Sequence, residues 1–280
     1  MFIVPAFPLP SNINKVINFR VPTVRDCMMV ADLNPEMDEA AATVFLNNQQ
    51  DKEKQGGVIY DALEWTGEDR RTALWWIYIA THEDTKLAYK FVINGEDRYI
   101  DIDLKDLDNT ATTLSIVPKV PITFKAGATE HTAIVKPLTG YALENIEVTA
   151  LQRDQFDVDS VQYRKLSNKI AMQEIIYSLV IDGEDEAIKT AKKDNENISR
   201  SDIEIAEEYR YQLIMNMPLE DNFRSLVAEI VAAKRKLQHG VLTSYMDGVY
   251  SLVASVDLGG ESGRQPLMFP FPSNTFIPTL

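Results

Sequence analysis

Apolar residues recur at helical spacing in the first and the last thirds of the chain. Intervals of three and four residues place them on one side of each segment, as in an amphipathic helix. Thr23 and Ser201 stand where N-cap residues are expected, and Pro218 ends one segment. The predicted helices span residues 24–33, 36–50, 58–65 and, after a charged turn at residues 67–71, 72–81 in the N-terminal part, and residues 160–180, 202–217 and 221–238 in the C-terminal part.

Between the two helical parts, the pattern changes to short runs rich in β-branched and aromatic residues. Ile100 and Ile102 alternate with polar neighbours, as expected of a half-buried strand. Asn94-Gly95 separates two such runs and is a strong short signal for a β-hairpin. Residues 86–148 are therefore predicted to form one compact antiparallel β module of four or five strands.

The order of these patterns is helical, then β, then helical, then β again. Such segregation favours an α+β fold over alternating βαβ units. Mostly helical N- and C-terminal parts flank a small antiparallel β module, and both termini are extended and rich in proline and phenylalanine. The predicted parts are an N-terminal extended arm and helical part (1–85), the β module (86–148), a C-terminal helical part (149–240), and a β-hairpin with an extended tail (241–280).

Both ends of the chain are apolar. Residues 265–280 contain no charged side chain, and their prolines exclude a continuous helix. Such segments are costly to leave in water, so they must pack on the chain's own body or on a neighbouring subunit. Both alternatives stay open, and a tail that only binds a partner would be dispensable for folding. The predicted partner-binding residues are Phe2, Phe7, Phe269, Phe271, Phe276 and Ile277.

Charge and cysteine usage exclude several classes of protein. The net charge of −14 argues against binding to nucleic acid or to an anionic membrane surface, both of which need a basic footprint. A single cysteine, Cys27, allows neither an intrachain disulfide nor a zinc site made of cysteines. No signal-peptide pattern and no apolar run of roughly 20 residues is present, so we expect a protein made in a cytoplasm.

Residues with catalytic or metal-binding chemistry are few and scattered. His82, His131 and His239 lie far apart in the sequence and match no metal-ligand spacing. Cys27 lies in an apolar context that favours a buried structural role over a nucleophile. The acidic run at residues 97–108 lacks the glycine and the glutamate of a calcium-binding loop. We therefore expect no catalytic residue, no metal and no cofactor.

Several segments stand in an order that is typical of one family. The chain opens with Phe7-Pro8-Leu9-Pro10-Ser11 and continues with RVPTVRD at residues 20–26. IDIDLKDL follows at residues 100–107, MNMP at residues 215–218 and an aromatic-proline end at residues 269–280. In order and spacing, these segments resemble the T-even-type baseplate hub and tail assembly proteins of contractile-tailed bacteriophages. Some members carry CxxC pairs in the β module, but this chain has none. The resemblance therefore does not imply a metal site in this chain.

The resemblance implies a structural component of the tail, located in the virion at the baseplate and assembled in the host cytoplasm. It implies several copies in a symmetric assembly, which contact hub, wedge or tape-measure proteins through helix faces and extended termini. The alternative is a tail or baseplate assembly chaperone that is absent from the mature virion. A third reading is an enzyme with a site built from distant residues, such as His131 with carboxylates of the β module.

Overall fold

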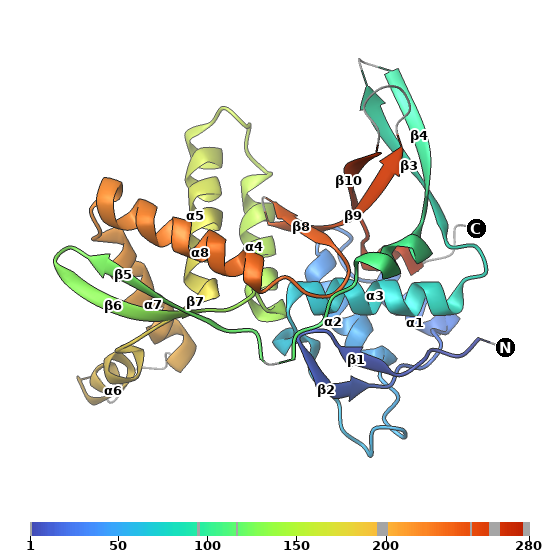
Figure 1. Ribbon diagram of the computed structural model, residues 1–280, viewed down its shortest axis with the longest axis horizontal. Helices are drawn as coiled ribbons and strands as arrows, with labels where there is room; N and C mark the ends of the chain where they lie inside the picture. Colours follow the sequence, from blue (N-terminus) through green and yellow to red (C-terminus); the bar gives the residue numbers. More distant parts are fainter. Residues whose placement is uncertain are drawn as a thin grey trace. The chain divides into compact units, whose positions relative to one another are not determined.

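The structure, a computed structural model, describes residues 2–93, 96–115, 117–194, 201–246, 248–257 and 264–276. Helices and small antiparallel sheets make up these residues, so the predicted α+β fold is confirmed (Figure 1). The chain forms two compact units. The first unit consists of residues 1–117, 139–151 and 239–280, and the second unit of residues 118–138 and 152–238.

The first unit combines helices with small sheets. Its helices are α1 (Val24–Ala31), α2 (Asp38–Gln49), α3 (Gly67–Thr81), most of α4 (Gly140–Arg153) and the short 3-10 helices η1 (Ala62–Glu64), η2 (Leu104–Thr110) and η4 (Ser273–Phe276). Its antiparallel sheets pair β1 (Phe7–Leu9) with β2 (Asn12–Ile17), β3 (Lys86–Ile93) with β4 (Glu96–Asp103), and β9 (Val249–Asp257) with both β8 (Thr243–Met246) and β10 (Arg264–Pro270).

Helix α3 forms the centre of the first unit's core. Its residues Leu74, Trp75 and Ile77 are at most 1% exposed. The Trp75 indole Nε1 donates a hydrogen bond to the Leu104 carbonyl at 2.7 Å, so even this polar group is satisfied within the core. The core therefore joins residues of α3 to the end of the β3–β4 hairpin.

Helix α3 begins five residues earlier than the pattern predicts. Thr66 and Asp69 form a capping box, in which the Asp69 N–H donates to Thr66 Oγ1 at 3.0 Å. The predicted charged turn at residues 67–71 is thus wrong. The prediction assumed that the charged residues would be exposed to water. Instead, Arg70 and Arg71 are buried near the start of α3 and contact other groups of the first unit.

The aromatic residues near both ends of the chain lie in the core of the first unit. Phe7, Phe269, Phe271 and Phe276 are at most 5% exposed. The Phe276 ring lies 4.6 Å from that of Phe45, between centroids, and so contacts α2. These four residues therefore pack on the chain's own body and not on a neighbouring subunit. The prediction that they bind a partner is wrong, because almost none of their surface is exposed. Phe2 is 43% exposed, and Ile277 lies outside the described residues.

The predicted β module at residues 86–148 does not form one unit. Its hairpin β3–β4 lies in the first unit, while β5 (Val120–Ala126) and β6 (Thr129–Val135) lie in the second. There, β6 pairs with β7 (Leu179–Ile181), which the helical pattern assigns to the end of a helix. The prediction of one module, and the four-part division that depends on it, is wrong because this pairing joins segments far apart in the sequence.

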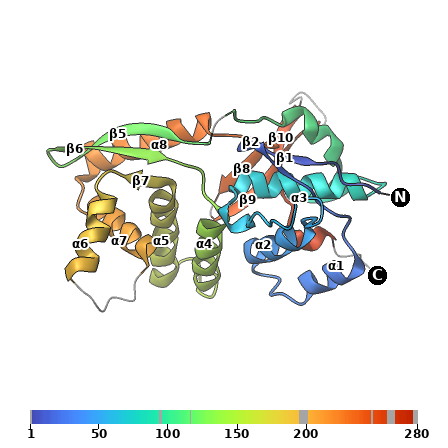
Figure 2. The same ribbon diagram turned by 90° about the horizontal axis from the view of Figure 1, so that it is seen from below.

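The second unit places helices on one face of the sheet β5–β6–β7. Besides these strands it contains α5 (Val161–Ser178), α6 (Glu184–Asp194), α7 (Asp202–Met215), the π-helical turn η3 (Leu219–Phe223) and α8 (Arg224–Lys236) (Figure 2). Alternate strand residues such as Phe124 and Val135 point inward and join Leu226 and Ile230 of α8 in one apolar cluster. The other face of the sheet is exposed, and Ile134 and Val180 lie opposite each other on it.

Replacing Phe269 by alanine should destabilise the first unit by about 3–5 kcal/mol, because it removes a fully buried ring of the core. The matched change Phe2→Ala removes a ring that is 43% exposed and should cost less than about 1 kcal/mol. Urea unfolding followed by tryptophan fluorescence measures this, since Trp65, Trp75 and Trp76 all lie in the first unit. Equal effects of the two changes would show that Phe269 is not part of the core.

Candidate functional site

The histidines predicted to be scattered lie in separate surroundings. His82 stacks on Tyr78 at the end of α3, and His131 stacks on Phe124 within the second unit. His239 is fully buried near the start of α3, where its Nε2 lies 2.7 Å from Thr66 Oγ1 and 3.6 Å from Asp69 Oδ1.

The group formed by Thr66, Asp69 and His239 has the residue types of a hydrolase triad but not its geometry. In a triad, the acid and the nucleophile bind different ring nitrogens of the histidine. Here Thr66 and Asp69 both approach Nε2, and Asp69 and His239 are 0% exposed. The Thr66 hydroxyl also caps α3. This group therefore stabilises the start of the helix rather than activating a nucleophile.

The single cysteine also has a structural setting. Cys27 on α1 donates its Sγ–H to the carbonyl of Phe276 at 3.3 Å. Burial, together with the negative charge of Asp26, raises the pKa of the Cys27 thiol. A raised pKa keeps the thiol protonated, which is the opposite of what a nucleophilic cysteine requires.

A buried cluster of charges joins α2 and α3. Arg70 is fully buried, and its Nη1 donates to Thr43 Oγ1 at 2.7 Å and to the Ala62 carbonyl at 2.9 Å. Its Nη2 lies 3.1 Å from Glu39 Oε2. Arg71 Nη2 lies 2.5 Å from Glu39 Oε1. Two buried guanidinium groups thus share one buried carboxylate, and main-chain and hydroxyl oxygens accept further hydrogen bonds from Arg70. The buried Nε atoms of Arg70 and Arg71 have no hydrogen-bond partner among the described residues.

Asp38 adds a second carboxylate to this cluster, 2.9 Å from Arg71 Nη2. Burial alone would lower the pKa of Arg71, but the charges of Glu39 and Asp38 outweigh it and raise that pKa. Removing either carboxylate would leave buried positive charge uncompensated, which is strongly destabilising. The ionic cluster is therefore interdependent.

Glu147 of α4 extends the cluster to a third helix. Its carboxylate accepts the main-chain N–H groups of Glu39 at 2.8 Å and Ala40 at 3.3 Å, at the N-terminus of α2. Burial and the nearby carboxylates of Glu39 and Asp38 raise the pKa of Glu147 to about 7, although the two N–H groups act in the opposite direction. The charges of the cluster face one another and the main chain, as in a structural ionic network.

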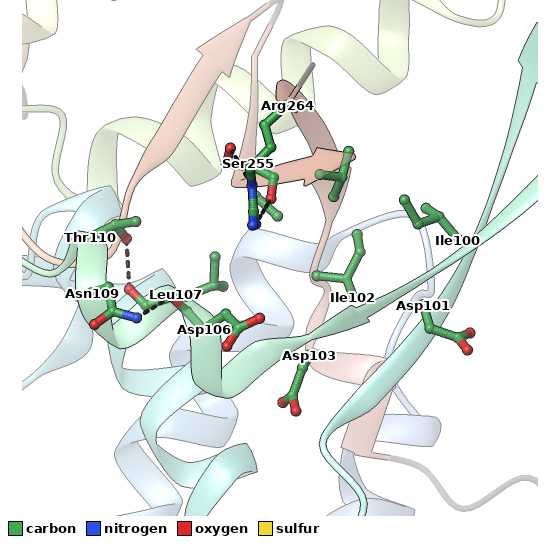
Figure 3. Close-up of a pocket in the computed structure, with 12 residues that line it drawn as sticks. Ile100, Asp101, Ile102, Asp103, Asp106, Leu107, Asn109, Thr110, Ser255 and Arg264 are labelled. Atoms are coloured by element: carbon green, nitrogen blue, oxygen red, sulfur yellow. Dashed lines mark hydrogen bonds between the residues drawn. The ribbon is translucent and has the colours of Figure 1, made fainter. Parts of the chain in front are cut away.

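An open groove lies elsewhere in the first unit, between the β3–β4 hairpin, η2 and the β9–β10 pair (Figure 3). Its volume is about 610 Å³. Its apolar lining includes Ile102, Leu107 and Val256, and its polar rim includes Asp106 and Arg264. Figure 3 shows the Arg264 side chain extending along β9 toward Ser255, whose carbonyl accepts a hydrogen bond from Arg264 Nη2 at 2.5 Å.

The carboxylates at the groove differ in what they already bind. Asp103 accepts hydrogen bonds from Thr85 Oγ1 at 2.7 Å and from the Lys105 N–H at 3.0 Å, and these lower its pKa. Asp101 and Asp106 are exposed. Among the described residues, the lining includes three aspartates and one arginine but neither histidine nor cysteine. Within the described part of the chain, no three histidine, cysteine or carboxylate side chains are grouped as metal ligands.

The sequence reveals only half of this groove. The acidic run at residues 97–108 is visible in the sequence, and its interpretation as the polar face of a strand holds for Asp101, which is exposed on β4. The opposite wall comes from β9 and β10, about 150 residues further along. No local pattern signals that these segments meet, because their proximity depends on how the first unit folds.

Exposed apolar residues form a second kind of surface on the first unit. Val24 and Met28 lie one turn apart on the same side of α1 and are 75% and 59% exposed. Phe2 and Ile3, in the extended segment before β1, are 43% and 73% exposed. We call Val24 and Met28 the α1 stripe. Single exposed apolar residues are common on protein surfaces, so the α1 stripe is a candidate contact because its two residues share one side of a helix.

No protein-family model, no curated protein and no solved structure matches this chain. None of the helices in the described ranges combines the length and apolar character required to cross a membrane.

Replacing Glu147 by glutamine should make the first unit less sensitive to alkaline pH. The folded-state pKa of about 7 is above the usual value of 4.5 for a glutamate, so the folded state binds a proton more tightly than the unfolded state. The Glu147 contribution to stability therefore falls between about pH 4.5 and pH 7 and stays low above it. We expect Glu147→Gln to gain about 1 kcal/mol on the wild type between pH 5 and pH 8, after allowing for partial exposure.

Thermal unfolding followed by tryptophan fluorescence at pH 5 and pH 8 measures this gain. Glu130→Gln, an exposed carboxylate of the second unit, is the control and should show no such trend. A Glu147→Gln protein that is destabilised equally at both pH values would instead mean that Glu147 is ionised at both and that its pKa is not raised.

Proposed function

We propose that this protein is a structural component of a contractile bacteriophage tail, in the baseplate hub region, where it binds other tail proteins. The observation that carries the proposal is the exposure of four large apolar residues of the first unit, namely Phe2, Ile3 and the two residues of the α1 stripe. Exposed apolar residues occur on most proteins, and a subunit of an assembly can bury those of one surface against its neighbours. A structural role of this kind requires no catalytic residue, metal or cofactor.

The segments that carry the resemblance to baseplate hub proteins support this proposal by their structural roles. In RVPTVRD, Arg20 Nη1 and Nη2 donate to the two oxygens of Asp26 at 2.6 and 2.7 Å. This bidentate pair holds the pKa of Asp26 well below its usual range. The same carboxylate accepts the Thr23 N–H at 2.7 Å and completes a capping box for α1. The motif thus positions the helix that carries the α1 stripe.

The opening segment FPLPS has a comparable role. Phe7 and Leu9 are buried in the core, and the Ser11 N–H donates to Asp69 Oδ1 at 2.8 Å, at the start of α3. The Pro10 carbonyl accepts the N–H of Leu114 at 2.9 Å. The residues of these two segments are thus ones on which the fold of the first unit depends.

In this proposal the chain occurs in several copies in a symmetric assembly, resides in the virion and contacts hub, wedge or tape-measure proteins. Its net charge of −14 favours protein partners over nucleic acid or an anionic membrane. The assembly chaperone is distinguished from a virion component by one measurement, because a chaperone leaves the finished particle.

Mass spectrometry of purified tailed particles from the encoding phage should detect the chain in a fixed ratio to other tail proteins. Complementation with a Val24→Asp/Met28→Asp variant should yield folded protein that is not incorporated, since both side chains are exposed and lie outside the core, whereas aspartate is incompatible with an apolar contact. Incorporation is read from the amount of the chain per particle.

The matched control is Val158→Asp/Val161→Asp. These two exposed valines lie in the second unit, and Val161 is the first residue of α5 as Val24 is of α1. This variant should be incorporated normally. Absence of the wild-type chain from particles would favour the chaperone. Equal incorporation of both variants would exclude the α1 stripe as a contact.

A further inference from the structure

One wall of the groove is the unpaired edge of β4. Among the described strands, β4 pairs with β3 alone. The Leu104 N–H bonds the Thr85 carbonyl, next to the opposed pair Lys86 and Asp103. Because main-chain groups alternate in direction along an antiparallel strand, those of Asp103 and Asp101 point away from β3.

The other wall contains the unpaired edge of β9. Strand β8 begins at Thr243, opposite Leu252, and the Val253 N–H bonds the Leu242 carbonyl at 2.9 Å. Two residues further along, the main-chain groups of Ser255 point to the same side of β9. No described residue of β8 lies opposite Ser255, so the edge is open from there to the end of the strand.

The residues that line the groove agree with this geometry. They include the consecutive residues 100–103 of β4 and 254–256 of β9, and none from β3 (Figure 3). Consecutive residues belong to both faces of a strand, so a cavity that contacts all of them borders the strand's edge. Four strand residues span about 13 Å, which is enough for a short extended segment to lie alongside.

The charges at the groove define the partner further. Among the described lining residues, three are carboxylates, Asp101, Asp103 and Asp106, and one is a cation, Arg264. We propose that this groove binds an extended, lysine- or arginine-containing polypeptide segment, which pairs with an open strand edge while its cationic side chains meet these carboxylates. Open strand edges bind extended peptides through main-chain hydrogen bonds, and neighbouring side chains supply the specificity.

Arg264 protects the edge when the groove is empty. Its guanidinium is exposed and binds the Ser255 carbonyl at 2.5 Å, so one main-chain acceptor of β9 is covered by a side chain. A charged side chain over a strand edge is a common protection against unwanted pairing. An incoming N–H group replaces this contact, and the incoming lysines reach Asp101 and Asp106 on the other wall.

This site goes beyond the proposed function, because it specifies a partner by its chemistry whether or not the assembly is a phage tail. It is also separate from the α1 stripe, which is apolar and belongs to another element. The particle measurements above do not depend on the groove, and the binding measurement below does not depend on particles. Failure of one proposal is therefore distinguishable from failure of the other.

The test uses the full chain and a fluorescein-labelled nine-residue peptide of alternating lysine and threonine. A second peptide with the same charge carries proline in place of threonine, which removes N–H donors and prevents regular strand pairing. We expect saturable binding of the threonine peptide by fluorescence anisotropy and at least about tenfold weaker binding of the proline peptide. Binding should also slow amide hydrogen exchange in β4 and β9.

Asp101→Asn/Asp106→Asn should weaken the binding of the threonine peptide several-fold. Asp108→Asn is the matched control, because Asp108 is an exposed carboxylate of η2 outside the groove lining, and it should bind normally. Circular dichroism confirms that each variant is folded. No binding, equal binding of the two peptides, or equal loss in Asp108→Asn would each overturn the proposal, as would exchange protection confined to other elements.

Discussion

The burial of Arg70 and Arg71 at the start of α3 is the constraint on which the first unit depends. Two guanidinium groups out of water must be met by acceptors, and α2 supplies them from Glu39, Asp38 and Thr43. The constraint reaches Gly140 at the start of α4, where a Cβ atom would lie 2.2 Å from Arg70 Nη1. It also reaches the end of the chain, because the Ser273 N–H donates to Asp38 at 2.8 Å. Segments from four parts of the sequence are thus held by one ionic cluster.

The ionic cluster lies in the interior of the first unit, away from the exposed residues that are candidates for binding a partner. The charges of the cluster contact one another and main-chain groups. Exposed apolar residues on α1, and open strand edges at the groove, remain at the periphery. The C-terminal phenylalanines belong to the interior in this division.

The locally encoded features were predictable from the sequence. The hairpin β3–β4, the capping of α7 by Ser201 and the strands β9 and β10 all follow from turn chemistry, capping and alternation over a few residues. The start of α3 was not predictable from the sequence, because the rule that charged residues face water fails where a second helix provides partners for Arg70. The acidic wall of the groove was visible in the sequence as a charge pattern. No sequence pattern indicated that β9 forms the other wall.

The sequence by itself determined the α+β class, most of the helices and the need of both apolar ends for a surface to dock on. These properties depend on neighbours within about one helical turn or one hairpin, where side-chain spacing is sufficient to specify them. Only the folded chain decided that Phe269 and Phe276 close their own core, that β7 joins β6, and that β4 and β9 border one groove. Such contacts join distant segments, and they are selected by the burial of area and charge in the whole unit, which no local pattern records.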